Sequence, residues 1–186
     1  MMPHKIDFYT DGSCSNKTWC GGWAMLGVNE DGAILFNDNG NEFNTTNNRM
    51  ELKAFLAALE EISNIVKENN KYYSEINIIT DSAYISNAIN QKWYANWQSN
   101  GWRTADRQPI ANQDLWKEIL VHYIRSINNP NINIKIKKIK AHQTRVVKNS
   151  NTEARWNSEV DKIAVAKRTE LEGENGLDEN ISNDAA

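Results

Sequence analysis

The sequence predicts a single domain built on a mixed α/β sheet. The chain has 186 residues, of which 40% are hydrophobic and 24% charged, so it is long enough for one hydrophobic core and has a globular composition. Strand patterns joined by turns come first, and strands that alternate with helices follow. This order, β-β-β-α-β-α-α-β-α, favours a mixed sheet.

Three strands and a long helix are predicted in the first half. Residues 5–11 (KIDFYTD) form a strand pattern, and residues 21–28 and 33–36 flank Asp31-Gly32, which is typical of a hairpin. A helix follows, and its candidate N-caps are Thr46, Asn47 and Asn48. Its apolar residues recur at spacings of 3, 4, 7 and 10, as expected for one buried stripe (Leu52, Phe55, Leu56, Leu59, Ile62).

Strands alternate with helices in the second half. Residues 75–80 (EINIIT) are short, apolar and β-branched, like strands buried in a parallel sheet. Residues 91–113 are irregular and aromatic, and residues 144–155 form a polar loop. The other predicted elements are helices at 82–90 and 115–127, a strand at 131–139 and a last helix from 160.

The charge of the chain is unevenly distributed. Residues 169–186 contain six of the 24 acids and no Lys or Arg, so residues 1–168 carry 21 bases against 18 acids, although the whole chain has a net charge of −3. We therefore expect one folded domain at 1–168, mildly basic and compatible with a polyanionic partner, and a disordered acidic tail at 169–186.

Composition also bears on the compartment. The chain shows no signal peptide and no apolar run long enough to span a membrane, so we expect no membrane association. Its two cysteines, Cys14 and Cys20, are too few for a disulfide scaffold and match no zinc spacing. We therefore expect a cytoplasmic protein with reduced thiols.

Four acids lie where a chemical site would place them. Asp11 ends the first strand, Asp81 ends the fourth, Glu51 lies in the first turns of a helix, and Asp161 lies in the first turn of the last helix. Four converging carboxylates would repel one another and so need cations such as Mg²⁺ or Mn²⁺, two of which can support phosphodiester hydrolysis. The alternative is ordinary turn chemistry and helix-dipole compensation.

Four segments resemble the signature segments of one family, type 1 ribonuclease H, in its bacterial form with a basic protrusion. They are TDGSC at 10–14, TTNNRMEL at 45–52, TDS at 80–82, and residues 157–161 followed by Ala164. The resemblance extends from about Ile6 to Lys167. It implies a ribonuclease H-like fold: a five-stranded mixed sheet, three antiparallel strands and then parallel ones, with helices on both faces.

The resemblance also implies a function. Asp11, Glu51, Asp81 and Asp161 would be catalytic residues that bind two Mg²⁺ ions, with Mn²⁺ as a substitute. The chain would be a monomeric endoribonuclease that cuts the RNA strand of RNA–DNA hybrids and leaves 3′-hydroxyl and 5′-phosphate ends. Two alternatives stay open: a DNA-cutting nuclease of the same broad fold, and a hybrid-binding module without activity. Because the first strand begins almost at Met1, we expect no further N-terminal hybrid-binding domain.

One histidine follows the last predicted strand. In the resembled family a histidine at the position of His142 shuttles a proton or helps to release the product, work that suits an imidazole. Residues 143–160 separate it from Asp161, a longer stretch than is usual in the family. This stretch, which contains Arg145, Lys148 and Arg155, is either a substrate-touching extension or inert length.

The aromatic segment interleaves tryptophans with cations. Four of the seven tryptophans fall between residues 93 and 116, among four cations, a combination suited to nucleic-acid backbones (Trp93, Trp97, Trp102 and Trp116; Lys92, Arg103, Arg107 and Lys117). The segment resembles the family's basic protrusion, or handle, which grips the DNA strand, so we expect Trp93, Trp97 and Trp102 to bind substrate. The alternative is a packed aromatic helix pair, above all for Trp93 and Trp97.

Further substrate contacts are implied by the resemblance. Asn47 and Asn48 would contact 2′-hydroxyls in the wide minor groove of the hybrid, and Thr46 and Asn112 would hold a phosphate of the DNA strand. The chain departs from the family at Asn44, at residues 16–20 and at Ala83. A second basic run (Lys135, Lys137, Lys138, Lys140) is typical of a solvated strand.

Overall fold

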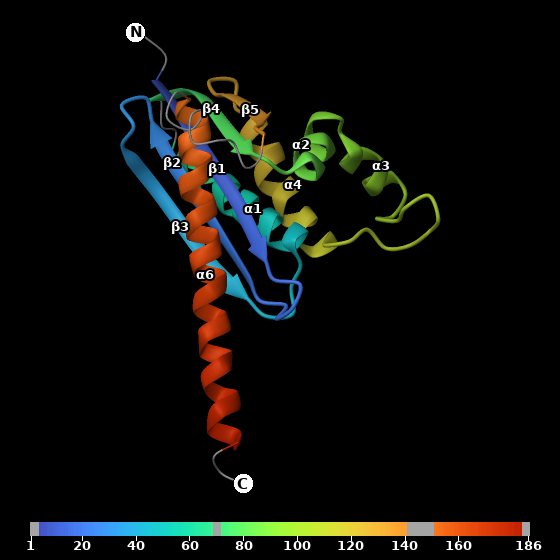
Figure 1. Ribbon diagram of the computed structural model, residues 1–186. Helices are drawn as coiled ribbons and strands as arrows, with labels where there is room; N and C mark the ends of the chain where they lie inside the picture. The colour runs from blue at the N-terminus through green and yellow to red at the C-terminus, as the bar shows by residue number, and fades with distance from the viewer. Residues whose placement is uncertain (1–3, 69–71, 141–150, 184–186) are drawn as a thin grey trace.

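A five-stranded mixed sheet forms the centre of the computed structural model, which describes residues 4–68, 72–140 and 151–183, with side chains through residue 174. The strand order is β3-β2-β1-β4-β5 (Figure 1). β1, β2 and β3 pair antiparallel, and β4 and β5 continue the sheet parallel to β1, as predicted. The strands are β1 (His4–Cys14), β2 (Gly21–Asn29), β3 (Ile34–Glu42), β4 (Tyr73–Thr80) and β5 (Asn133–Lys138).

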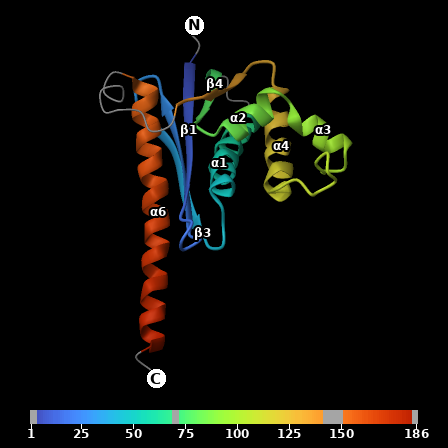
Figure 2. The same cartoon turned by 45° about the vertical axis from the view of Figure 1, so that its right-hand side comes forward.

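The helices cover both faces of this sheet. α6 lies alone on one face, and α1 and α4 lie on the other, with α2 and α3 beyond the β5 edge (Figures 1 and 2). The helices are α1 (Asn47–Lys67), α2 (Ala83–Asn90), α3 (Trp93–Ser99), α4 (Gln113–Ile127) and α6 (Thr152–Asn183). α3 lies in a segment expected to be irregular. Its seven residues are too few to show a helical apolar period.

Each face of the sheet has its own hydrophobic core. Side chains alternate along β1, so that Ile6 and Phe8 pack under α1, whereas Tyr9 packs under α6. The five residues of the predicted α1 stripe are all buried. On the other face, Val160 and Ala164 of α6 are fully buried against the sheet.

Edge strand β3 is longer than predicted. The sequence indicates a strand at 33–36, but the strand continues through Asn37 and Asp38 to Glu42. These polar side chains are mostly exposed and show no apolar alternation. The strand exists because its backbone pairs with β2 from Gly21 to Val28.

The last helix is also longer than predicted, at both ends. It begins at Thr152, and it continues through Asn183, where the sequence predicts a disordered tail from residue 169. Leu171 is buried, and the Thr18 hydroxyl donates to the Glu172 carboxylate at 2.6 Å, so the first residues after 168 pack on the domain. The acidic composition of the tail concealed Leu171, which lies seven residues after Ala164 and so on the same helix face. Farther on, the helix extends past the sheet (Figure 1).

Candidate active site

Two of the predicted acids meet where β4 ends beside β1. Asp81 directly follows β4, but β1 does not end at Asp11 as predicted, because its pairing with β2 continues to Cys14. β1 and β4 are parallel, and Thr10 pairs with Thr80, so the next residues, Asp11 and Asp81, lie side by side at the sheet edge. This is the position in which open α/β sheets place ligands. Asp11 is buried, and its Oδ1 accepts a hydrogen bond from the Gly12 backbone N–H at 2.8 Å.

The third acid comes from α1. The Thr46 hydroxyl accepts from the Arg49 backbone N–H and caps the helix, which fixes where its first turns begin. Glu51 then faces β1, and it is only 5% exposed. Ligand oxygens of Asp11, Glu51 and Asp81 all lie within 4.8 Å of one another.

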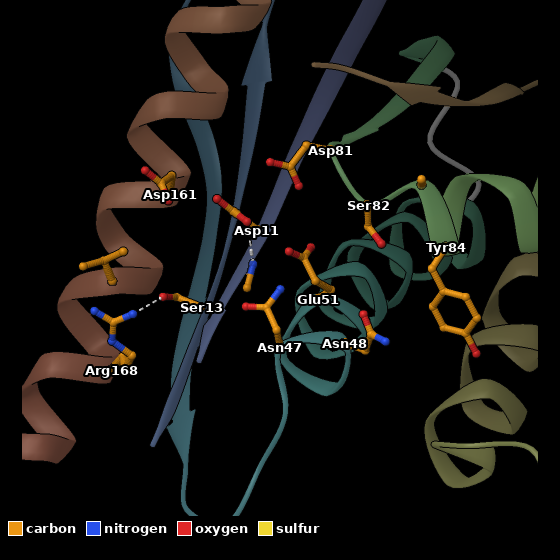
Figure 3. A pocket seen from close by; sticks show the side chains of 13 residues that line it. Asp11, Ser13, Asn47, Asn48, Glu51, Asp81, Ser82, Tyr84, Asp161 and Arg168 are labelled. Carbon is orange, nitrogen blue, oxygen red and sulfur yellow. Dashed lines mark hydrogen bonds between the residues drawn. The ribbon is translucent and has the colours of Figure 1, made fainter. Parts of the chain in front are cut away.

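Asp161 faces the other three acids across a cleft. The cleft has a volume of about 540 Å³ and also contains Ser13, Asn47 and Arg168 in its lining. Figure 3 shows α6 forming one wall, which carries Asp161 next to Asp11, while α1 forms the opposite wall. The structure therefore brings together all four acids that the sequence singled out.

Burial and the repulsion of neighbouring carboxylates disfavour the charged forms of Asp11 and Glu51. Burial, together with the charges of Asp81 and Asp161, raises the pKa of Asp11 to about 7. Burial and the charge of Asp11 raise the pKa of Glu51 well above its usual value. Glu51 Oε2 is buried, and no described residue offers it a hydrogen bond. Hard divalent cations would satisfy this oxygen and neutralise the cluster, so the donor set fits Mg²⁺ or Mn²⁺.

The chain matches the family model for RNase H over residues 3–169. It belongs to the ribonuclease H family. It is 43% identical to the ribonuclease H of Treponema denticola over 121 residues, which cover 61% of this chain and 75% of that protein. It is 38% identical to the ribonuclease H of Caldicellulosiruptor saccharolyticus over 149 residues, which cover 78% of this chain and 89% of that protein.

Solved structures of ribonuclease H domains share the fold. The solution structure of the PFV RNase H domain superposes with a TM-score of 0.69 at 23% identity, covering 90% of this chain and 96% of that one. RNase H1 from Halobacterium salinarum superposes with a TM-score of 0.55 at 16% identity, covering 88% and 96%. The ribonuclease H-like sheet expected from the sequence is thereby confirmed.

The start of α1 presents the polar residues expected to touch substrate. Asn47 and Asn48 are exposed and line the cleft (Figure 3). Thr46 precedes them, and Asn112 lies just before α4 in a left-handed conformation with φ 54°. The residues expected to contact substrate therefore lie at the starts of two helices, α1 and α4.

Arg49 connects the two predicted phosphate-binding residues. Its guanidinium donates twice to Asp114, at 3.1 and 2.8 Å, and lies 3.5 Å from Asn112 Oδ1. Its Nε donates to Glu42 at 2.8 Å, and its backbone N–H binds Thr46. Sequence reasoning did not single out Arg49, although it lies within the TTNNRMEL string.

The handle tryptophans pack against one another. Trp97 contacts the buried Trp116 at a centroid distance of 5.1 Å, and Trp93 and Trp102 lie 6.5 and 6.4 Å from Trp97. All three predicted substrate-binding tryptophans are half-buried against the core. This packing favours the aromatic-cluster alternative, and the exposed side chains of the segment include its cations, Lys92, Arg103 and Arg107.

Other predicted features fall outside the cleft. His142 and the loop as far as residue 150 lie outside the described residues. Lys135 and Lys137 on β5 pair with Glu75 at 3.2 Å and Glu153 at 3.8 Å, in keeping with a solvated strand. Within the described part of the chain, no helix has the length and apolar character needed to cross a bilayer.

Sequence reasoning missed Ser13, Tyr84 and Arg168, which also line the cleft. Two of them had a positional signal. Ser13 lies two residues after Asp11 on a strand, and Arg168 lies seven residues after Asp161 on a helix, so each returns to the side of a predicted acid.

Proposed function

We propose that this protein hydrolyses the RNA strand of RNA–DNA hybrids endonucleolytically, using two Mg²⁺ ions, with Mn²⁺ as a substitute, and leaving 3′-hydroxyl and 5′-phosphate ends. The observation that supports this most directly is the convergence of Asp11, Glu51 and Asp81 within 4.8 Å, beside Asp161, in one cleft of a ribonuclease H-family chain.

The four acids would hold the metal ions. Two divalent ions bound there would activate a water molecule and stabilise the leaving oxygen of the phosphodiester. Gly12 and the Thr46 cap set the position of Glu51, so the carboxylates are already arranged before substrate binds. His142 would move a proton near the reacting oxygens.

The polar rim would select the hybrid. Asn47 and Asn48 supply amides beside the acids, where 2′-hydroxyls of an RNA strand in a wide minor groove are within reach. Thr46 and Asn112, held together by Arg49, would bind a phosphate of the DNA strand. Exposed cations of the handle would add contacts to the DNA backbone. Trp93, Trp97 and Trp102 would hold these cations in place from the aromatic cluster, and the exposed parts of their rings would also contact the substrate.

The proposal includes a monomer that acts in the cytoplasm. A monomer suffices chemically because all four acids come from one chain. Gel filtration of the purified protein, alone and with a short hybrid, tests the monomer. Cell fractionation of the source organism tests the location.

Cleavage assays on matched substrates test the function. End-labelled RNA is presented as a hybrid, as duplex RNA and as a single strand, and labelled duplex DNA is included, each with Mg²⁺, Mn²⁺ or EDTA. We expect cleavage of the hybrid RNA strand alone, no reaction in EDTA, and products that carry a 5′-phosphate. Asp11→Asn should bind hybrid without cutting it. Cleavage of duplex DNA would favour the DNA-nuclease alternative, and binding without any cleavage would favour a non-catalytic module.

A further inference from the structure

Arg168 places a cation on the α6 wall of the active-site cleft. It follows Asp161 by seven residues, about two helical turns, so both side chains face the cleft from the same side of α6 (Figure 3). The axial rise between them is about 10 Å, from 1.5 Å per residue. Arg168 thus lines the same cleft as the carboxylates but lies about two helical turns away from Asp161.

The position of Arg168 is set by β1 and β2. Its Nη1 donates to Ser13 Oγ at 2.8 Å, and Ser13 is 9% exposed and lies on the same side of β1 as Asp11. Gly22 pairs with Ser13 across the sheet, and a Cβ there would lie 2.5 Å from the Arg168 backbone nitrogen. The Ser13–Arg168 pair therefore lies alongside Asp11 and Asp161, and the close packing of α6 on β2 at Gly22 sets its position.

The guanidinium keeps unused binding capacity. It has five N–H donors, of which Ser13 takes one. Its Nε is buried and has no hydrogen-bond partner among the described residues, although the Glu172 carboxylate lies within ion-pair distance of it at 3.9 Å. The donors left for a ligand are therefore those of the two terminal nitrogens. Glu172 instead accepts a 2.6 Å hydrogen bond from Thr18. The Arg168 side chain is 26% exposed, so a ligand in the cleft has access to it.

We propose that Arg168, anchored by Ser13, is a further substrate-binding residue that contacts a backbone phosphate of the RNA strand within a few nucleotides of the cleaved bond. This rests on the proposed function. A polyanion that enters a cleft lined by four carboxylates needs compensating cations, and arginine binds phosphate oxygens through paired, directional donors. The RNA strand is assigned because Arg168 shares its wall with Asp161, which would hold metal at the strand that is cut.

A second role would predict different behaviour. If Arg168 only offset the charge of the carboxylates, its removal would strengthen Mg²⁺ binding and leave the salt dependence of hybrid binding unchanged. If it contacts a phosphate, its removal weakens hybrid binding, and the released counterions decrease by about one.

The experiment compares Arg168→Gln and Arg168→Lys with Lys162→Gln, which removes the same charge from α6 at a residue that pairs with Glu159 and does not line the cleft. Binding is measured in the Asp11→Asn background, with hybrids that carry a single neutral methylphosphonate linkage at successive positions of either strand. Each protein is compared with itself on unmodified hybrid, so a change in folding does not affect the comparison. Hybrid cleavage by the unmodified chain is recorded separately and reports on the proposed function.

We expect Arg168→Gln to weaken hybrid binding about 10-fold and to reduce the slope of the log binding constant against log salt concentration by about 0.7 to 0.9. The Mg²⁺ concentration at which metal binding is half complete (the Mg²⁺ midpoint) should stay unchanged. One neutral linkage in the RNA strand should weaken binding by the chain with Arg168 and lose that effect in Arg168→Gln, while Arg168→Lys retains part of it. Lys162→Gln should behave like the parent. The proposal is overturned if the linkage scans of parent and Arg168→Gln coincide, if the sensitive linkage is in the DNA strand, or if only the Mg²⁺ midpoint moves.

Discussion

Gly12 and Glu51 approach so closely that a Cβ on Gly12 would lie 2.3 Å from the Glu51 backbone nitrogen. The same Cβ would lie 2.6 Å from the carbonyl carbon of Met50. Glycine at this position therefore lets α1 rest directly on the end of β1. The distance between the Asp11 and Glu51 carboxylates depends on that contact.

Gly12→Ala should accordingly damage both stability and chemistry. Overpacking at a backbone contact costs about 1–3 kcal/mol in the free energy of unfolding, and a shift of α1 by about 1 Å can lower kcat by about 10²-fold. Urea unfolding and hybrid cleavage measure the two effects. Gly173→Ala is the matched control, because a Cβ there meets nothing within 4 Å. Equal activity of both variants would show that α1 does not rest on Gly12.

The metal-free protein should lose stability as the pH rises. The pKa of Asp11 is raised from 3.8 to about 7, so the folded state holds this proton more tightly than the unfolded state. The ionised Asp11 carboxylate therefore destabilises the folded state increasingly between about pH 4 and 7, and the full effect is present above that range. Thermal melts in EDTA at pH 5 and pH 8 should show a larger decrease in Tm for the parent than for Asp11→Asn. Mg²⁺ should restore the parent's Tm at pH 8, and identical pH dependence of the two proteins would contradict the prediction.

Trp97 and the handle cations should affect different quantities. Trp97→Ala removes the ring that joins Trp116 to Trp102, so it should lower the free energy of unfolding by roughly 2–4 kcal/mol. The Lys92→Gln, Arg107→Gln double variant should leave stability unchanged, raise KM, and reduce the salt slope by up to about 1.8. The Lys67→Gln, Lys162→Gln double variant controls for net charge, because it removes two positive charges outside the handle and the cleft. If Trp97→Ala kept its stability but bound hybrid more weakly, the result would instead support direct contact between the Trp97 ring and the substrate.

Truncation within α6 should separate its packed part from its extension. Ending the chain after Lys167 removes buried Leu171, the Thr18–Glu172 hydrogen bond and the Arg168–Ser13 hydrogen bond, and should lower the free energy of unfolding by about 1.5–3 kcal/mol. Because it also removes Arg168, this truncation should weaken hybrid binding as Arg168→Gln does. Ending it after Glu174 should preserve stability and activity. Urea titrations of the two truncations decide the point. Equal stability would mean that residues 168–174 contribute nothing to the fold.

His142→Ala should lower kcat by about 10²-fold with little change in hybrid affinity, because a proton carrier acts on the chemical step. Single-turnover cleavage measures this step apart from binding. Complete inactivity would instead indicate a role in metal binding, and full activity would show that another residue or water moves the proton.

The mixed sheet, the α1 stripe and the four candidate acids could all be predicted from the sequence. Each depends on signals that are local in the chain: strand and helix periods, residues that end strands, and the TTNNRMEL string. Such signals can be recognised without knowing how the helices and strands pack together. The same local reasoning was wrong about the tail at Leu171, because an acidic composition averaged over 18 residues concealed one apolar position on a helix face.

Which side chains share a surface could not be predicted in this way. Arg49 contacts Asn112 across 63 residues of sequence, and Arg168 contacts Ser13 across 155. The sequence of the handle is the same whether its tryptophans face DNA or pack on Trp116, and only the ring contacts in the structure distinguish these two arrangements. Partners so distant in sequence are chosen by the packing of whole helices on the sheet, and no local pattern records that choice.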